Sequence, residues 1–265
     1  MTSQFQPPQI AHSTIGNVAS RPRSFRYSAV KLLLALGLLD LSAPFIEDLP
    51  NGDMVESALL TLVMIFSVLA IGSSRRTLLT AAVLFVPALA GKWASHFFPG
   101  VVTSVVYLVA AMVFFAFVVA HLIRFILRAT HVDANVLCAG LSGYILLGLL
   151  WLPAYVMVAK IDPGSLSLPA GASMDGFNAF YFSFITLCTV GYGDVTPVSK
   201  GARMLAVTEA IAGLFYVAVL ISRLVAIYTS PPPALAAASP AKATVGSAPE
   251  DFLTENQTST EPKNL

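Results

Sequence analysis

The chain has 265 residues, of which 56% are hydrophobic and only 11% are charged, and its formal net charge is +1. Soluble domains carry roughly 25% charged residues, so a chain this apolar has too little polar surface for water and is expected in a lipid bilayer. The near-zero net charge gives no sign of a nucleic-acid partner.

The two ends of the chain differ in composition from its middle. Residues 1–26 are polar and rich in Pro and Arg, without the apolar run that a signal peptide needs, so we expect a disordered cytoplasmic arm. Residues 230–265 are rich in Pro, Ala, Ser and Thr and cannot build a core. They are predicted to form a disordered cytoplasmic tail.

Apolar runs fill the sequence between these arms. A helix needs roughly 20 apolar residues to span a bilayer core of about 30 Å. Six runs meet or approach that length, at about 28–46, 55–72, 77–95, 101–127, 135–159 and 202–228. A seventh run, 176–187, is too short to span and is expected to be a re-entrant helix.

These runs predict an all-α membrane protein with six transmembrane helices and one re-entrant helix. Residues 27–130 would form a four-helix transmembrane domain, and residues 131–229 would form a second module with the last two spans. Six spans place the following basic residues on one side: Arg21, Arg23, Arg26, Lys31, Arg75, Arg76, Arg124, Arg128 and Arg223. The positive-inside rule makes that side cytoplasmic, which predicts a multi-pass protein of the cell (inner or plasma) membrane with both termini inside.

Asp40, Lys92 and Glu209 are three of the charged residues within the predicted spans. Charges inside a membrane are costly and are usually paired, so Asp40 and Lys92 either form an ion pair or lie separately at the interface. Glu209, in the sixth span, either supports the neighbouring loop and its electric field or forms a local hydrogen bond behind the short helix.

The most informative segment is 186–194, Thr-Leu-Cys-Thr-Val-Gly-Tyr-Gly-Asp, which lies between the short helix and the last span. A potassium ion gives up its water only where other oxygens replace it, so successive backbone carbonyls must point to one axis. Gly191 and Gly193 permit the unusual backbone angles that this requires, because they have no Cβ. Thr189 can add a hydroxyl oxygen, and Val190 and Tyr192 would point away from the axis and pack.

One such segment cannot surround an ion, whereas four copies can. The segment therefore predicts a homotetramer. The short helix adds to the site, because Asp175 can cap its N-terminus and the negative end of its dipole near Leu187 would favour a cation.

Residues 135–228 resemble the pore module of potassium channels, with an outer helix, a pore helix, a filter and an inner helix. Segment 186–194 is similar to the TxxTVGYGD signature of that family at every fixed position. The resemblance implies that the carbonyls of Thr189, Val190, Gly191 and Tyr192 line the K⁺ sites, with Gly193 completing the filter. It also implies filter-supporting roles for Thr186, Cys188, Asp194, Tyr181, Phe182 and Glu209.

The same resemblance places a hinge and a gate in the last span. Gly213 falls where the family often has a hinge glycine, and Leu214, Val217, Ile221 and Val225 would face the cavity and the inner gate. Alternatively, these four side chains pack against lipid or other helices. Many simple bacterial members have a Trp-Trp pair and a Glu behind the filter, where this chain has Tyr181, Phe182 and Ile185. Tyr181 could still reach Asp194.

The fourth span lacks the repeated arginines of a voltage sensor. It holds Arg124, with Arg128 just beyond, and both lie near the predicted cytoplasmic end. Several charges are needed because each contributes only about 2.3 kcal/mol per 100 mV. We therefore expect weak or absent voltage dependence.

The sequence thus predicts a potassium-selective channel subunit whose partners are lipid, K⁺ and three copies of itself. The alternatives are a weakly selective cation channel and a nonconducting membrane sensor or scaffold. No nucleophile with a base and no metal-ligand grouping is visible, so we expect neither an enzyme nor a cofactor. Cys188, beside the filter, is either a reactive thiol or a small buried side chain.

Overall fold

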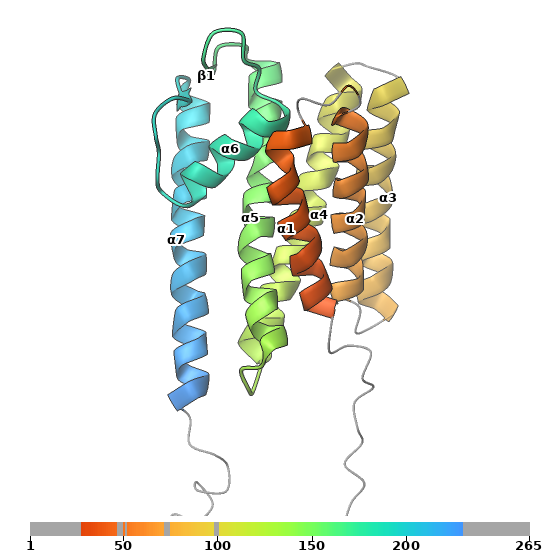
Figure 1. Ribbon diagram of the computed structural model, residues 1–265, viewed down its shortest axis with the longest axis vertical. Coiled ribbons are helices and arrows are strands. Elements are labelled where there is room, and N and C mark those ends of the chain that lie inside the picture. The colour runs from red at the N-terminus through yellow and green to blue at the C-terminus, as the bar shows by residue number, and fades with distance from the viewer. Residues whose placement is uncertain (1–27, 47–49, 51, 72–74, 98–100, 230–265) are drawn as a thin grey trace, which may run out of the picture. The chain divides into compact units, whose positions relative to one another are not determined.

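The computed structural model describes residues 28–46, 50, 52–71, 75–97 and 101–229, and the two predicted arms lie outside these residues. Four long helices come first: α1 (Ser28–Ile46), α2 (Gly52–Ile71), α3 (Arg75–Phe97) and α4 (Val101–Arg128). Each follows its neighbour in the opposite direction, so that the four form a bundle (Figure 1). Their bounds agree with the predicted spans to within a few residues.

The second half of the chain contains two more long helices with a short one between them. These elements are α5 (Ala134–Ile161), β1 (Leu166–Ser167), α6 (Gly176–Leu187), β2 (Thr196–Pro197) and α7 (Lys200–Thr229). Among the described residues, six helices are long and apolar enough to cross a membrane, and α6 is not. The predicted all-α membrane fold is confirmed, and α6 has the bounds of the predicted re-entrant helix.

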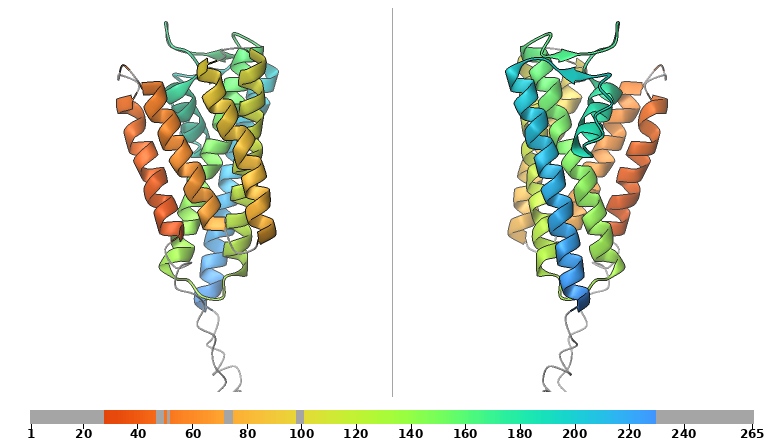
Figure 2. Two further views of the ribbon diagram at one scale, coloured as in Figure 1. Left: turned by 90° about the vertical axis from the view of Figure 1, so that its right-hand side faces the viewer. Right: turned by 90° about the vertical axis from the view of Figure 1, so that its left-hand side faces the viewer.

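The buried core joins the first four helices to α5. Leu32 and Leu36 of α1, Phe114 and Val118 of α4, and Leu146 of α5 are fully buried in one cluster. Both α1 and α4 pack along α5, so the four-helix domain is fixed to the outer helix of the second module. Figure 2 shows α7 on the other side of α5, beside α6.

Small residues on α5 allow α6 and α7 to approach closely. A Cβ on Gly148 would lie 2.7 Å from the ring of Phe184 in α6. A Cβ on Gly140 would lie 2.9 Å from Leu220 in α7, and the Tyr216 hydroxyl donates to the Gly140 carbonyl at 2.7 Å. Glycines on α5, which have no side chain, therefore determine how closely the re-entrant helix and the last helix approach it.

The ion pair predicted within the first four helices forms with a different acid. Lys92 Nζ of α3 lies 3.3 Å from Glu56 Oε1 of α2. Asp40 Oδ1 is buried in α1 without a hydrogen-bond partner among the described residues. Of the two alternatives considered for Asp40 and Lys92, the ion pair between them is not observed, because α2 places the acid Glu56 at the depth of Lys92.

Candidate functional site

The pore helix α6 begins at the predicted cap residue, but the predicted cap bond is not made. Asp175 occupies the N-cap position with an extended backbone, and its side chain forms no bond to the first turn. Instead, Asp175 Oδ1 accepts a hydrogen bond from Ser173 Oγ. The carboxylate still lies at the positive end of the helix, where the dipole favours it.

The backbone after α6 alternates between two conformations. Thr189, Gly191 and Gly193 have φ angles of 57°, 55° and 86°, whereas no positive φ is recorded for Val190 or Tyr192. An added Cβ on either glycine would meet nothing within 4 Å, so the backbone angle, not the space, requires glycine there. Reversal at every second residue is what turns successive carbonyls toward one side.

The N–H groups at the start of this loop bond back to the pore helix. Val190 N and Gly191 N both donate to the Ile185 carbonyl, at 2.9 and 3.2 Å, and Thr189 N donates to the Thr186 carbonyl at 3.0 Å. Among the described residues, no backbone donor reaches the carbonyls of Thr189 to Tyr192. These carbonyls are thus available as ligands for a cation.

Tyr192 of the loop stacks on the pore helix. Its ring lies 6.4 Å from the ring of Tyr181, centroid to centroid, and the two planes differ by 3°. Loss of water around the Tyr181 hydroxyl, and then the nearby Asp194 carboxylate, raise the pKa of Tyr181. The Tyr181 hydroxyl therefore lies near Asp194, and a supporting bond between them stays a prediction.

A short antiparallel pair holds the far end of the loop. Leu166 of β1 pairs with Pro197 of β2, and Ser167 pairs with Thr196. Val198 N and Ser199 N also donate to the Ser165 carbonyl, at 2.8 and 3.1 Å. The loop is thus fixed at both ends, at α6 and at the segment that follows α5.

Glu209 of α7 is fully buried and joins three helices behind the filter. Its Oε1 lies 2.6 Å from the Ser183 hydroxyl of α6, and its Oε2 accepts from the Tyr155 hydroxyl of α5. Ser183 Oγ also lies 2.8 Å from the Gly148 carbonyl. The local hydrogen bonds that the sequence suggested as one alternative are therefore present, and the role of Glu209 in supporting the filter stays a prediction.

The other predicted supporting residues are placed differently. Phe182 is buried and meets Tyr155 edge to face, with ring centroids 4.8 Å apart. Cys188 is exposed, with its Sγ 3.4 Å from the Tyr144 hydroxyl, so the buried thiol that we considered is wrong for the single chain. Thr186 supports the loop through the bond from Thr189 N to its carbonyl.

Gly213 lies within an unbroken helix and against the end of α6. A Cβ at this position would be 2.5 Å from the Leu187 carbonyl oxygen. Leu214, Val217, Ile221 and Val225 are exposed on α7. The described structure thus gives Gly213 a close-packing role, and its hinge role stays a prediction.

Replacing Gly213 with alanine distinguishes these two roles. We expect Gly213→Ala to lower stability by about 1–3 kcal/mol, because the new methyl group overlaps the Leu187 carbonyl. Adding Ala212→Gly, which returns a glycine to the helix one residue away, will not restore the melting temperature. Recovery of both stability and activity in the double variant would instead identify a hinge.

Arg223, one of the basic residues predicted on the cytoplasmic side, also bonds within the chain. Its Nη2 donates to the Ala129 carbonyl, just after α4, at 2.9 Å.

Sequence reasoning missed three other features of the site: the hydroxyls of Tyr155 and Ser183, and the positive φ of Thr189. A polar residue in an apolar run was the available signal for the first two, whereas a β-branched residue gives no signal of positive φ.

The family match among the comparisons with known proteins falls in the second module. Residues 143–230 match the protein family described as "Ion channel". Two pore potassium channel c of Oryza sativa subsp. japonica is 36% identical over 63 residues, which are 24% of this chain and 14% of that protein. Voltage-gated potassium channel Kch of Escherichia coli (strain K12) is 46% identical over 48 residues, 15% of this chain and 12% of that protein.

A third similar protein is Protein LctB of Bacillus caldotenax, 43% identical over 61 residues, which are 22% of this chain and 45% of that protein. The chain thus spans less than half the length of each of these curated relatives, and no solved structure matches it. The family match begins within α5 and includes α6, the loop and α7. Residues 143–230 are therefore similar to ion channels, and short stretches of the chain are similar to potassium channels.

Proposed function

We propose that this protein is one subunit of a homotetrameric channel that conducts K⁺ selectively and passively across a cell membrane. The observation that carries the proposal is the alternating backbone at Thr189, Gly191 and Gly193, with the N–H groups of Val190 and Gly191 bonded to the pore helix. This leaves a run of carbonyl oxygens on one side of the loop. Carbonyls in such an arrangement replace the hydration shell of K⁺.

The exposure of apolar side chains in the single chain supports assembly. Val190 and Tyr192 are 53% and 73% exposed, although both lie in the loop that would pack around an ion path. Leu214 and Phe215 of α7 are 67% and 64% exposed. Neighbouring copies would cover these surfaces, and four loops around one axis would complete the ion sites.

The two ends of the bundle differ in charge, which supports the proposed orientation. Arg75 and Arg76 at the start of α3 lie at the same end of the bundle as Arg128 and Arg223. This is the end at which a short turn connects α4 to α5. The opposite end carries the filter loop together with Asp162, Asp175 and Asp194 (Figure 1). The positive-inside rule would place the basic end, and both termini, in the cytoplasm.

Recording from purified protein in a planar bilayer tests the proposal. With K⁺ on one side and Na⁺ on the other, we expect the reversal potential to shift as it does for a membrane that is permeable to K⁺ but not to Na⁺. A permeability ratio near one would identify the weakly selective channel, and the absence of any current would favour the sensor or scaffold. A stable monomer in the bilayer would also contradict the proposal, because one loop cannot enclose an ion.

A voltage ramp in the same recording tests the second part of the proposal. Open probability is expected to change little with voltage, because α4 holds only Arg124 and Arg128, both in its last turns. A steep rise in open probability over a few tens of millivolts would show that charge elsewhere crosses the membrane field.

A further inference from the structure

A cavity of about 910 Å³ lies between the first four helices and the second module. Residues from α1 to α5 and from the first turns of α6 line it, and it is partly open. Protein interiors hold few voids larger than a water molecule, and sites for small organic ligands have volumes of about 300–1,000 Å³. The size of this cavity is that of a ligand site.

One part of the cavity wall is apolar. Met64, Leu108, Phe115, Leu149 and Val156 line it, and each of them is buried. This surface suits a hydrocarbon chain, which a membrane supplies wherever a cavity opens between helices.

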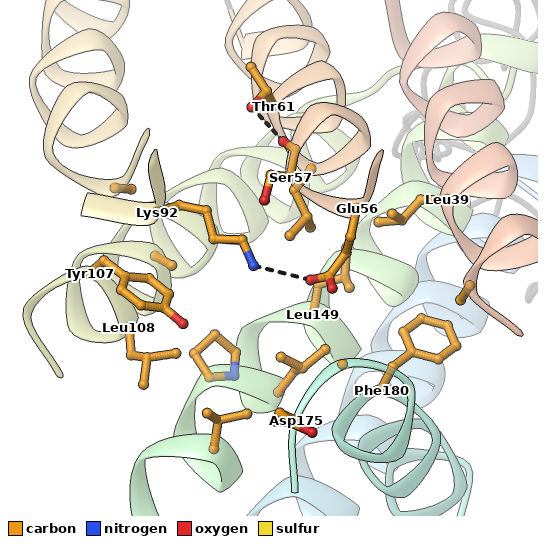
Figure 3. Close-up of a pocket in the computed structure, with 18 of the residues that line it drawn as sticks. Leu39, Glu56, Ser57, Thr61, Lys92, Tyr107, Leu108, Leu149, Asp175 and Phe180 are labelled. Carbon is orange, nitrogen blue, oxygen red and sulfur yellow. Dashed lines mark hydrogen bonds and ion pairs between the residues drawn. The ribbon is translucent and has the colours of Figure 1, made fainter. Parts of the chain in front are cut away.

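Charged groups of both signs line another part of the cavity. Figure 3 shows Lys92, Glu56, Tyr107 and Asp175 around one space, with the Lys92–Glu56 ion pair at 3.3 Å. The Tyr107 hydroxyl of α4 faces the same space. Lys160 adds a second ammonium group to the lining.

Two acids and two cations together favour a ligand that carries both charges. An ammonium group can bind between Asp175 and Glu56, and a phosphate can bind Lys92, Lys160 and the Tyr107 hydroxyl. We propose that this cavity binds one phospholipid with a zwitterionic head group, an acyl chain lying along the apolar wall. A purely anionic lipid would bring no ammonium group of its own to bind the two carboxylates.

The cavity also adjoins the filter through the pore helix. Phe177 and Phe180 of α6 line it. The ring of Phe177 lies 6.2 Å from that of Tyr181, and the ring of Tyr181 stacks on that of Tyr192 in the filter. A bound lipid would thus support the first turn of the pore helix, which gives the first four helices a role in conduction. This role, unlike the binding itself, rests on the proposed function.

Lipid binding to delipidated full-length protein tests the inference, with two pairs of matched variants. Ala111→Phe and Ala88→Leu fill the cavity from α4 and α3, whereas Ala116→Phe and Ala90→Leu add the same side chains at exposed positions of the same helices. Native mass spectrometry with phosphatidylethanolamine is expected to show one retained lipid per subunit in the parent and in both exposed-site variants. Both cavity variants should bind at least about ten-fold more weakly, a loss of about 1.4 kcal/mol.

Phosphatidylglycerol, which is anionic, provides the head-group comparison and is expected to bind about ten-fold more weakly than phosphatidylethanolamine. Equal binding of the two lipids would overturn the inference, as would equal retention by cavity and exposed-site variants. If one cavity variant fails to fold, the other pair of variants and the head-group comparison still test the inference. Binding is measured without ion flux, so a protein that binds the lipid but passes no K⁺ would refute the proposed function and leave this site standing.

Discussion

Gly193→Ala will abolish selective K⁺ flux while leaving the helices folded. Gly193 has a φ of 86°, a conformation that alanine adopts at a cost of about 1–3 kcal/mol, and a tetramer would incur that cost four times. The loop can avoid the strain only by turning the Tyr192–Gly193 peptide, and that movement takes the Tyr192 carbonyl away from the ion path. We expect K⁺ flux into vesicles to fall by at least about 100-fold, because a missing carbonyl site leaves the ion partly dehydrated without a ligand.

A second glycine provides the matched control for this prediction. Gly171, in the loop between β1 and α6, has a φ of 84°, and an added Cβ there would also meet nothing within 4 Å. Gly171→Ala therefore introduces the same local strain away from the filter and should leave flux and selectivity near the parent values. Equal flux in the two variants would show that the loop at Gly193 has no part in conduction.

Glu209→Ala is expected to have the largest effect on stability. It leaves the buried hydroxyl of Tyr155 without its acceptor, at about 1–3 kcal/mol, it removes one of the two partners of the Ser183 hydroxyl, and it opens a void between three helices. Thermal unfolding of the purified assembly should shift to a clearly lower temperature, and K⁺ flux should fall with it because α6 carries the filter.

Glu209→Gln is expected to retain most of the stability that Glu209→Ala loses. The Ser183 hydroxyl has one proton and lies close to two acceptors, Gly148 O and Glu209 Oε1. A proton on the carboxyl group would complete this network, and the glutamine amide supplies an equivalent donor to Ser183 while its carbonyl accepts from Tyr155. The amide variant should therefore melt near the parent temperature. If it melts as low as Glu209→Ala, the network depends on a negative charge and the bonding described here is wrong.

Much of the pore module could be predicted because its signals are local. The length and polarity of each run gave the spans, and a run too short to cross gave the bounds of α6. The two glycines predicted the unusual backbone of the filter because only glycine adopts positive φ at little cost. Asp175 was placed at the start of α6 from its position alone, although its bond to Ser173 depends on a loop conformation that the sequence does not specify.

The sequence by itself determined the number of spans, the short helix and the filter segment, because each depends on residues that are close together in the chain. The tertiary structure alone decided that Lys92 pairs with Glu56, that Glu209 bonds to α5 and α6, and that Gly213 faces the Leu187 carbonyl. These contacts depend on how each helix is rotated about its axis. In α1 and α7 apolar residues surround the whole helix, so no periodicity indicates which face meets a neighbour. Close packing of small and large side chains sets that rotation only when the helices meet.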